Sequence, residues 1–298
     1  MAFKFLKRAL AALGLAAASI APQAASAQAA AKPALWEVSD PDTTIYLLGT
    51  IHLLPSNYSW RGKAIDRAIA RSDSLVVETI VDSKNPQALA AELARLGFSR
   101  GLPPLANRIH PAKRPLLQAA IVKSGVPPHV LDQMETWAAA FTLLGVQFKE
   151  LGLHGEHGVE QTLREAFAAA GKPVGQLETN GEQLGFFDTL PQNAQRSLLE
   201  GAIETPNSMS ADFAEMLRAW ASGDVDAIAR TFNQGFAESP ELREALLRRR
   251  NANWSQWIAR RLASPGTTLV AVGAGHLAGP DSVQDLLQRS GYRVKRVQ

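Results

Sequence analysis

Apolar positions along the chain follow two periodicities, and the order in which they alternate predicts an α/β fold. Apolar runs of strand length are Leu35–Val38, Thr43–Leu48, Ser74–Thr79, Lys172–Leu177, Thr267–Val272 and Tyr292–Val297. Helical spacing fills most of the remaining chain, including a long region over about residues 85–171. We therefore predict an α/β (α+β) protein with a mixed β-sheet core drawn from both chain ends and a large, mainly helical insert.

Two of these predicted strands run into the same short motif. Residues 45–53 and 269–277 each pass from apolar residues into Gly-x-x-His-Leu, which places His52 and His276 just beyond a strand. Glycine there permits a sharp turn and close approach of the backbone to a ligand. Ligands of open α/β sheets bind beyond the carboxyl ends of strands. We expect the two imidazoles to meet in one pocket; the alternative is that each histidine only shapes a turn.

The first residues have the pattern of an export signal. Lys4, Lys7 and Arg8 precede an apolar run over residues 9–20, and a small-x-small cleavage site follows at residues 25–27. We predict a signal peptide over residues 1–27, a mature domain over 28–298 and a periplasmic or secreted protein. An uncleaved N-terminal anchor is the alternative.

Charge and composition limit the classes of binding partner that we expect. The formal charge of +3 disappears when the three basic residues of the signal are removed, so no general attraction to nucleic acid or anionic membrane is expected. The rest of the chain contains no apolar stretch of membrane-spanning length, and stable membrane insertion after cleavage is not expected. Cysteine is absent, which excludes thiol chemistry and disulfides. The oligomeric state stays open.

Charged residues near the predicted strand ends complete a candidate site. Glu78 and Glu178 each end an apolar strand, and Glu160 opens a helix after Gly158. Arg250 lies on the apolar side of its helix, where a guanidinium is costly unless it is paired. It is expected either to pair with a site carboxylate or to hold negative charge of the substrate. The alternatives are solvated strand ends for the carboxylates and a structural ion pair for Arg250.

The motifs together resemble the TraB/GumN family, which is related to the TIKI proteins, and the GumN-like bacterial branch in particular. In chain order they are Leu47-Leu48-Gly49-Thr50-Ile51-His52-Leu53, Leu75-Val76-Val77-Glu78, Gly158-Val159-Glu160, Gly171-Lys172-Pro173-Val174, Leu177-Glu178-Thr179, Glu182-Gln183-Leu184, Arg250-Asn251-x-x-Trp254 and Val272-Gly273-Ala274-Gly275-His276-Leu277. The resemblance implies a metal-dependent protease that favours Mn²⁺ or Co²⁺. It carries family roles onto His52, Glu78, Glu178, Arg250 and His276, whereas Glu160 stands where many relatives have Asp.

The resulting hypothesis is an exported metal-dependent hydrolase that acts on a peptide or protein. His52, Glu78 and His276 are expected to hold a divalent metal, Mn, Co or Zn, because imidazole and carboxylate are suitable ligands for these ions. Glu178, Arg250 and Glu160 are expected to be catalytic. Glu178 is expected to be the general base and Arg250 to stabilise negative charge in the transition state, and the carboxylates can exchange roles. The alternatives are a non-catalytic periplasmic binding protein for a peptide, haem or glycan, and an interaction protein whose motifs only shape turns.

Overall fold

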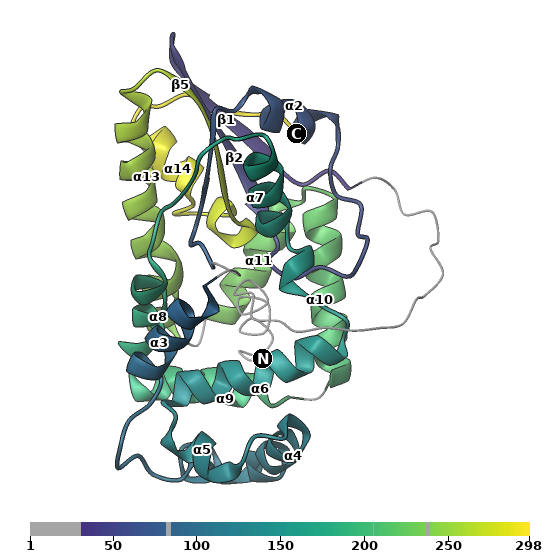
Figure 1. The fold of residues 1–298 in the computed structure, drawn as a ribbon, viewed down its shortest axis with the longest axis vertical. Coiled ribbons are helices and arrows are strands. Elements are labelled where there is room, and N and C mark those ends of the chain that lie inside the picture. Colours follow the sequence, from purple (N-terminus) through teal and green to yellow (C-terminus); the bar gives the residue numbers. More distant parts are fainter. Residues whose placement is uncertain (1–30, 82–84, 205, 237–238) are drawn as a thin grey trace.

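The computed structural model describes residues 31–81, 85–204, 206–236 and 239–298 and shows a mixed sheet with helices on both faces (Figure 1). The α/β fold class predicted from the sequence is confirmed. The signal peptide predicted over 1–27 lies outside the described residues. Among the residues that are described, no helix is long and apolar enough to cross a membrane.

Six strands form the sheet in the order β4-β3-β5-β2-β1-β6. Their bounds are β1 Leu35–Ser39, β2 Thr43–Thr50, β3 Ser74–Val77, β4 Val174–Gln176, β5 Gly266–Gly273 and β6 Val294–Arg296. β2, β3, β4 and β5 are parallel, whereas β1 runs antiparallel to β2 and β6. Because Thr50 at the end of β2 pairs with Gly273 at the end of β5, the two Gly-x-x-His segments leave the sheet at the same edge.

The two faces of the sheet are both buried, as expected for parallel strands covered by helices. Alternate residues of β2 point to opposite faces: Ile45 and Leu47 join one apolar cluster, and Tyr46 and Leu48 join the other. The first cluster packs under α13 (Arg249–Leu262) and α14 (Val283–Arg289), and the second under α2 (Lys63–Arg71) and α7 (Val159–Ala169). This sandwich holds the strand ends rigidly in place.

Both long connections of the sheet are helical. The remaining α-helices are α3 Pro86–Leu96, α4 Arg114–Ser124, α5 Pro128–Gln133, α6 Thr136–Glu150, α8 Asn180–Asp188, α9 Gln192–Ala202, α10 Pro206–Ala221, α11 Val225–Phe236 and α12 Pro240–Arg243. Short helices are η1 Leu105–Asn107, η2 Pro111–Lys113, η3 Gly155–His157, η4 Glu244–Arg248 and η5 Ala274–Leu277. α6 packs along α9, with α4 and α5 at the end of the molecule far from the sheet (Figure 1). The region 85–171 is mainly helical, and helices also form most of the chain between β4 and β5, as the helical spacing there predicts.

One irregular turn lies beside the candidate site. Residues 240–262 form one continuous helical rod, as their spacing predicts, but its turn over Glu244–Arg248 is a π-helix. Such wide turns occur mostly as single insertions in α-helices, often at functional sites. Here the turn ends just before Arg250, whose Nη1 donates to the Leu246 carbonyl at 3.3 Å.

Candidate functional site

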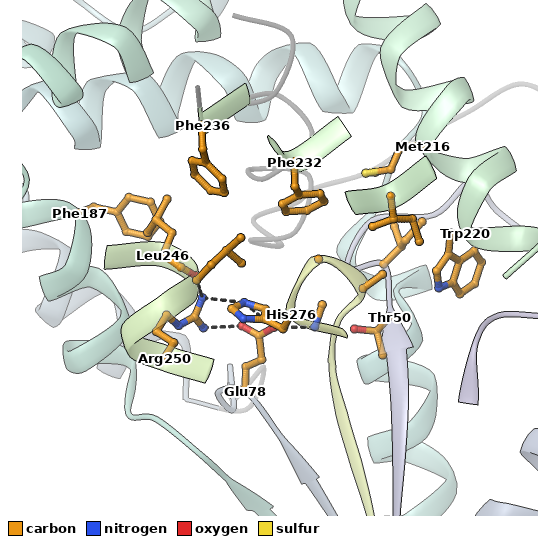
Figure 2. Close-up of a pocket in the computed structure, with 16 residues that line it drawn as sticks. Thr50, Glu78, Phe187, Met216, Trp220, Phe232, Phe236, Leu246, Arg250 and His276 are labelled. Atoms are coloured by element: carbon orange, nitrogen blue, oxygen red, sulfur yellow. Dashed lines mark hydrogen bonds and ion pairs between the residues drawn. The ribbon is translucent and has the colours of Figure 1, made fainter. Parts of the chain in front are cut away.

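The carboxyl ends of the four parallel strands supply most of the candidate residues. His52 follows β2, Glu78 follows β3, Glu178 lies two residues beyond β4, and His276 lies in η5 directly after β5. Arg250 reaches them from α13 on one face of the sheet. Figure 2 shows Glu78, Arg250 and His276 pointing toward one another at the base of a pocket. The structure thus brings together residues from five separate segments.

The Arg250 guanidinium is the centre of this cluster, and all five of its N–H groups have acceptors. Nε donates to Glu178 Oε1 at 2.9 Å, and Nη2 donates to Glu78 Oε2 at 2.6 Å and to Glu178 Oε2 at 2.8 Å. Nη1 donates to the Leu246 carbonyl and to His276 Nε2, the latter at 3.1 Å. Of the two roles expected from the sequence, the contacts support pairing with site carboxylates. No N–H of Arg250 is left for a substrate.

His276 is held as a neutral imidazole. Asn251 Nδ2 donates to the Asp281 carbonyl, so its Oδ1 accepts from His276 Nδ1 at 2.6 Å. The lone pair of His276 therefore lies on Nε2, which faces Arg250. Burial and the Arg250 charge lower the pKa of His276 to about 3. Asn251 was not predicted from the sequence as part of the site, although it follows Arg250 directly in the motif.

His52 is held by a different carboxylate. Its Nδ1 lies 2.6 Å from Glu160 Oε1, which also accepts from Thr50 Oγ1. Burial lowers the pKa of His52, but the facing carboxylates of Glu160 and Glu78 outweigh burial, and the net pKa is raised. A Cβ at Gly158 would lie 2.1 Å from the His52 carbonyl oxygen, so only glycine lets α7 begin here. That close approach positions Glu160, in the first turn of α7, beside the imidazole.

A small space separates His52 from Glu78. His52 Nε2 is 3.9 Å from Glu78 Oε1, and a Cβ at Gly273 would lie 3.1 Å from that oxygen and 3.6 Å from the nitrogen. Gly273 N also donates to Glu78 Oε1 at 2.6 Å. Burial raises the pKa of Glu78, but the nearby cations, Arg250 above all, lower it to about 2. Glu78 is therefore ionised at neutral pH.

Glu178 behaves differently from Glu78 although both contact the same guanidinium. Burial raises the pKa of Glu178, and the Arg250 charge only partly offsets it. With Glu78 ionised, the single charge of Arg250 is shared between two buried carboxylates. Glu178 supports Arg250, and no contact places it beside the space between His52 and Glu78.

The residues expected to hold a metal surround one oxygen atom. His52 Nε2 and His276 Nε2 lie 3.9 and 3.8 Å from Glu78 Oε1. Bonds of roughly 2.1 Å to a shared ion would bring neighbouring ligand atoms to about 3.0–3.4 Å. His276 Nε2 moreover accepts from the cationic Arg250, and the described residues contain no group of three His, Asp or Glu side chains placed to hold an ion. As arranged, these residues do not fit a resident metal, and their metal-binding roles stay a prediction.

Comparison with known proteins identifies the family. The family model described as TraB/PrgY/gumN matches residues 34–296. The chain belongs to the TraB/PrgY/gumN family. It is similar to the uncharacterized protein YbaP of Escherichia coli (strain K12), with 25% identity over 243 residues covering 82% of this chain and 87% of the relative. It is also similar to an uncharacterized protein of Treponema pallidum (strain Nichols), with 22% identity over 85% of this chain and 80% of that relative. No solved structure gave a significant match.

This TraB/PrgY/gumN family protein also has an apolar pocket above the polar cluster (Figure 2). Its polar base is formed by Thr50, Glu78, Arg250, Gly273 and His276. Its apolar walls are Phe187, Met216, Trp220, Ile228, Phe232, Phe236, Leu246 and Leu247. The walls were not predicted from the sequence, because apolar residues four apart on a helix are the pattern of any buried helix face.

The cluster should make the family member acid-sensitive. Glu78 has a folded pKa of about 2 against an ordinary 4.5, so its stabilisation is present above pH 4.5 and lost as pH falls toward 2. His276 resists protonation until about pH 3, whereas the unfolded chain takes up that proton near 6.5. We expect the free energy of unfolding to fall as the pH is lowered from 6.5 to 2, and the complete Glu78 shift accounts for ~3 kcal/mol of that fall. His52, with its raised pKa, adds stability as the pH falls toward 6.5 and does not offset the loss below that pH.

Urea unfolding at several pH values measures the effect. In His276→Gln the free energy of unfolding should depend less on pH between 6.5 and 3, because the imidazole that stays unprotonated in the folded protein has been removed. The exposed His129 supplies the control, and His129→Gln should keep the wild-type dependence. An unfolding free energy that stays constant from pH 7 to 4 in the wild type would contradict this account.

Proposed function

We propose that this protein is a hydrolase of peptide bonds in which His52 is the general base. The observation that supports the proposal best is the His52–Glu160 pair, with Nδ1 held at 2.6 Å from the carboxylate and Nε2 turned toward Glu78 and Gly273. A histidine oriented by a carboxylate through one ring nitrogen, with the other left for a proton, is the recurring base of acyl-transfer enzymes.

The proposed reaction uses these positions. A water beside His52 Nε2 and Glu78 Oε1 transfers one proton to Nε2 while its oxygen bonds to the carbonyl carbon. Glu160 keeps the proton on Nδ1 and stabilises the imidazolium. When the tetrahedral intermediate collapses, the C–N bond breaks and His52 returns its proton to the leaving amine, so a carboxylic acid and an amine are formed. Glu78, ionised, orients the water by accepting its second proton in a hydrogen bond.

The proposed location is the periplasm or the outside of the cell, because the first residues have the pattern of an export signal. Substrates would then be peptides or proteins outside the cytoplasm. Cell fractionation, with N-terminal sequencing of the purified protein, tests this part. A protein that starts near Gln28 in the periplasmic or secreted fraction supports it, and an intact N-terminus in the cytoplasm contradicts it.

Hydrolysis is tested by incubating the purified protein with a mixed peptide library in water enriched in ¹⁸O. Each cleaved bond should carry one ¹⁸O in its new carboxyl group, detected by mass spectrometry. The His52→Gln variant should show no cleavage, and the exposed-site control His129→Gln should match the wild type. A folded wild-type protein that cleaves no peptide in a broad library overturns the proposal.

Metal removal is expected to leave the protein unchanged. Arg250 already supplies a positive charge at His276 Nε2 and Glu78 Oε2, where a metal would otherwise compete. Dialysis against a strong chelator should therefore change the hydrolysis rate by less than about twofold and leave the unfolding temperature unaltered. Elemental analysis accompanies the assay. Loss of activity that Mn²⁺ or Co²⁺ restores, with binding weakened by His276→Gln, would reinstate the metal-dependent hydrolase predicted from the sequence.

The apolar walls of the pocket also favour a second candidate, a binding protein that holds an apolar peptide without cleaving it. Buried hydroxyl-rich ligands need many hydrogen-bond partners. Among the residues that the structure describes, the polar groups of this pocket are confined to its base, which disfavours a glycan. Haem ligation by His276 would require its contact with Arg250 to break. Tight peptide binding without ¹⁸O incorporation would support this second candidate.

A further inference from the structure

The pocket combines a charged base with walls whose described residues are all apolar. Figure 2 shows Arg250, Glu78 and His276 together below Phe232 and Phe236, which lie on the opposite side. The centre of a water-sized sphere can move through about 50 Å³ of this pocket. A pocket of this kind orients a ligand by a few polar groups and takes up the rest by apolar contact.

Most of the walls come from α10 and α11, whereas the base comes from the strand ends and from α13. Met216 and Trp220 lie one turn apart on α10, and Ile228, Phe232 and Phe236 lie on successive turns of α11. The Trp220 indole donates to the Gly49 carbonyl at 2.8 Å, which ties α10 to the end of β2. The apolar walls are therefore fixed relative to the strand ends that carry His52 and Glu78.

Glycine at position 275 brings the aromatic wall close to the reactive groups. A Cβ on Gly275 would lie 2.3 Å from ring carbons of Phe232, so the ring rests directly on the backbone of η5. Phe232 stays half-buried and lines the pocket rather than disappearing into the core. The next residue, His276, lies in the polar base. Within η5, Gly275 therefore contacts the apolar wall and the next residue, His276, belongs to the polar base.

The charges around the pocket disfavour ligands with a charged group. Among the described residues, the charged groups that line the pocket are Arg250 and Glu78, and they form an ion pair at 2.6 Å. A charged ligand group entering the apolar part would lose its hydration without gaining a free counter-ion, which is strongly unfavourable. An aromatic or branched aliphatic group would bury its surface against Phe232, Phe236 and Met216 and gain affinity in proportion to its area.

We infer that this pocket receives a large apolar side chain, aromatic or branched aliphatic, of the residue next to the peptide bond held at His52 and Glu78. The pocket is then the specificity-determining subsite of the enzyme. This inference rests on the proposed hydrolase function for the identity of the bond, but the pocket binds the side chain whether or not cleavage follows.

Binding is measured first without turnover. The His52→Gln variant is titrated calorimetrically with N-acetylated hexapeptide amides that differ at one position, occupied in turn by alanine, glutamate, leucine or phenylalanine. We expect the leucine and phenylalanine peptides to bind roughly 30–100-fold more tightly than the alanine and glutamate peptides at the position that enters the pocket. The variable position is moved along the hexapeptide in separate series. Equal affinities for the alanine, glutamate, leucine and phenylalanine peptides in every series would overturn the inference.

Two wall variants then locate the effect. Phe232→Ala removes part of the wall and Met216→Trp fills the space, and each should reduce the phenylalanine-over-alanine preference at least tenfold. Phe98→Ala is the matched control, because Phe98 is 40% exposed and does not line the pocket. Thermal unfolding shows whether each variant is folded. Should Phe232→Ala fail to fold, the result for Met216→Trp alone decides the test. If the folded wall variants keep the wild-type preference for phenylalanine over alanine peptides, the side chain binds outside this pocket and the inference is contradicted.

The two proposals fail separately. If the wild type shows the apolar preference in binding but incorporates no ¹⁸O, the hydrolase proposal fails and the subsite stands as a binding site. If it cleaves peptides with no preference for apolar residues, and the wall variants cleave the same set, the hydrolase stands and the subsite inference fails.

Discussion

Replacing Arg250 with methionine is expected to lower the free energy of unfolding by about 3–5 kcal/mol. Methionine fills a similar volume but leaves Glu78 and Glu178 buried side by side without a cation. Both carboxylates lie within hydrogen-bond distance of the guanidinium, at 2.6 and 2.8 Å, and both are almost fully buried. Each must then take up a proton or draw in water, and the strand ends β3 and β4 lose their common anchor. Urea unfolding at pH 7 measures the change.

Neighbouring variants separate the charge from the packing. Arg249 is exposed on the same helix, so Arg249→Met should change stability by no more than about 0.5 kcal/mol. Adding Glu178→Gln to Arg250→Met should restore part of the loss, because it removes one uncompensated charge. Arg250→Lys should give an intermediate loss, since an ammonium cannot reproduce the forked contacts. If Arg250→Met were as stable as Arg249→Met, the guanidinium would not be the centre of the cluster.

The buried position of Arg250 illustrates what the sequence can predict. Leu246 and Trp254 lie one turn before and after it, so helical geometry alone places the guanidinium on an apolar face and requires a partner. In the same way, His52, Glu78 and His276 each follow an apolar strand, and the carboxyl ends of parallel strands share one edge of a sheet. The local periodicity of the sequence was therefore enough to predict these strands and this helix, and the edge of the sheet at which the site residues lie.

The choice of partners could not be predicted in this way. Which carboxylate contacts Arg250 and which contacts His52 depends on the strand order β4-β3-β5-β2, and strand order is a long-range property. Glu160 looked like an ordinary acidic residue at a helix start, and its contact with His52 exists because α7 begins directly against the backbone at Gly158. Asn251 gave no signal of its own, because an asparagine in a polar helix resembles a surface residue.

Changing His52 to glutamine is expected to lower kcat for peptide hydrolysis by ~10²–10⁴-fold, the usual contribution of a general base. The wild-type kcat/KM should rise with pH, because only the neutral imidazole accepts a proton. Its inflection should lie above the ordinary 6.5, since Glu160 and Glu78 raise the pKa of His52. In Glu160→Gln one of these carboxylates is gone, so the inflection should move to lower pH while kcat falls.

A double variant tests whether His52 and Glu160 act as one unit. Glu160 acts only through the imidazole that it orients, so once His52 is glutamine its loss should cost nothing further. Groups that act together show strongly non-additive effects on kcat, and His52→Gln/Glu160→Gln should be no slower than His52→Gln alone. Effects that multiply would mean that the two residues act independently, and a pH profile unmoved in Glu160→Gln would mean that another group is the base. Either result would remove the physical basis of the mechanism, because the 2.6 Å contact between the two side chains is what marks His52, rather than His276, as the base.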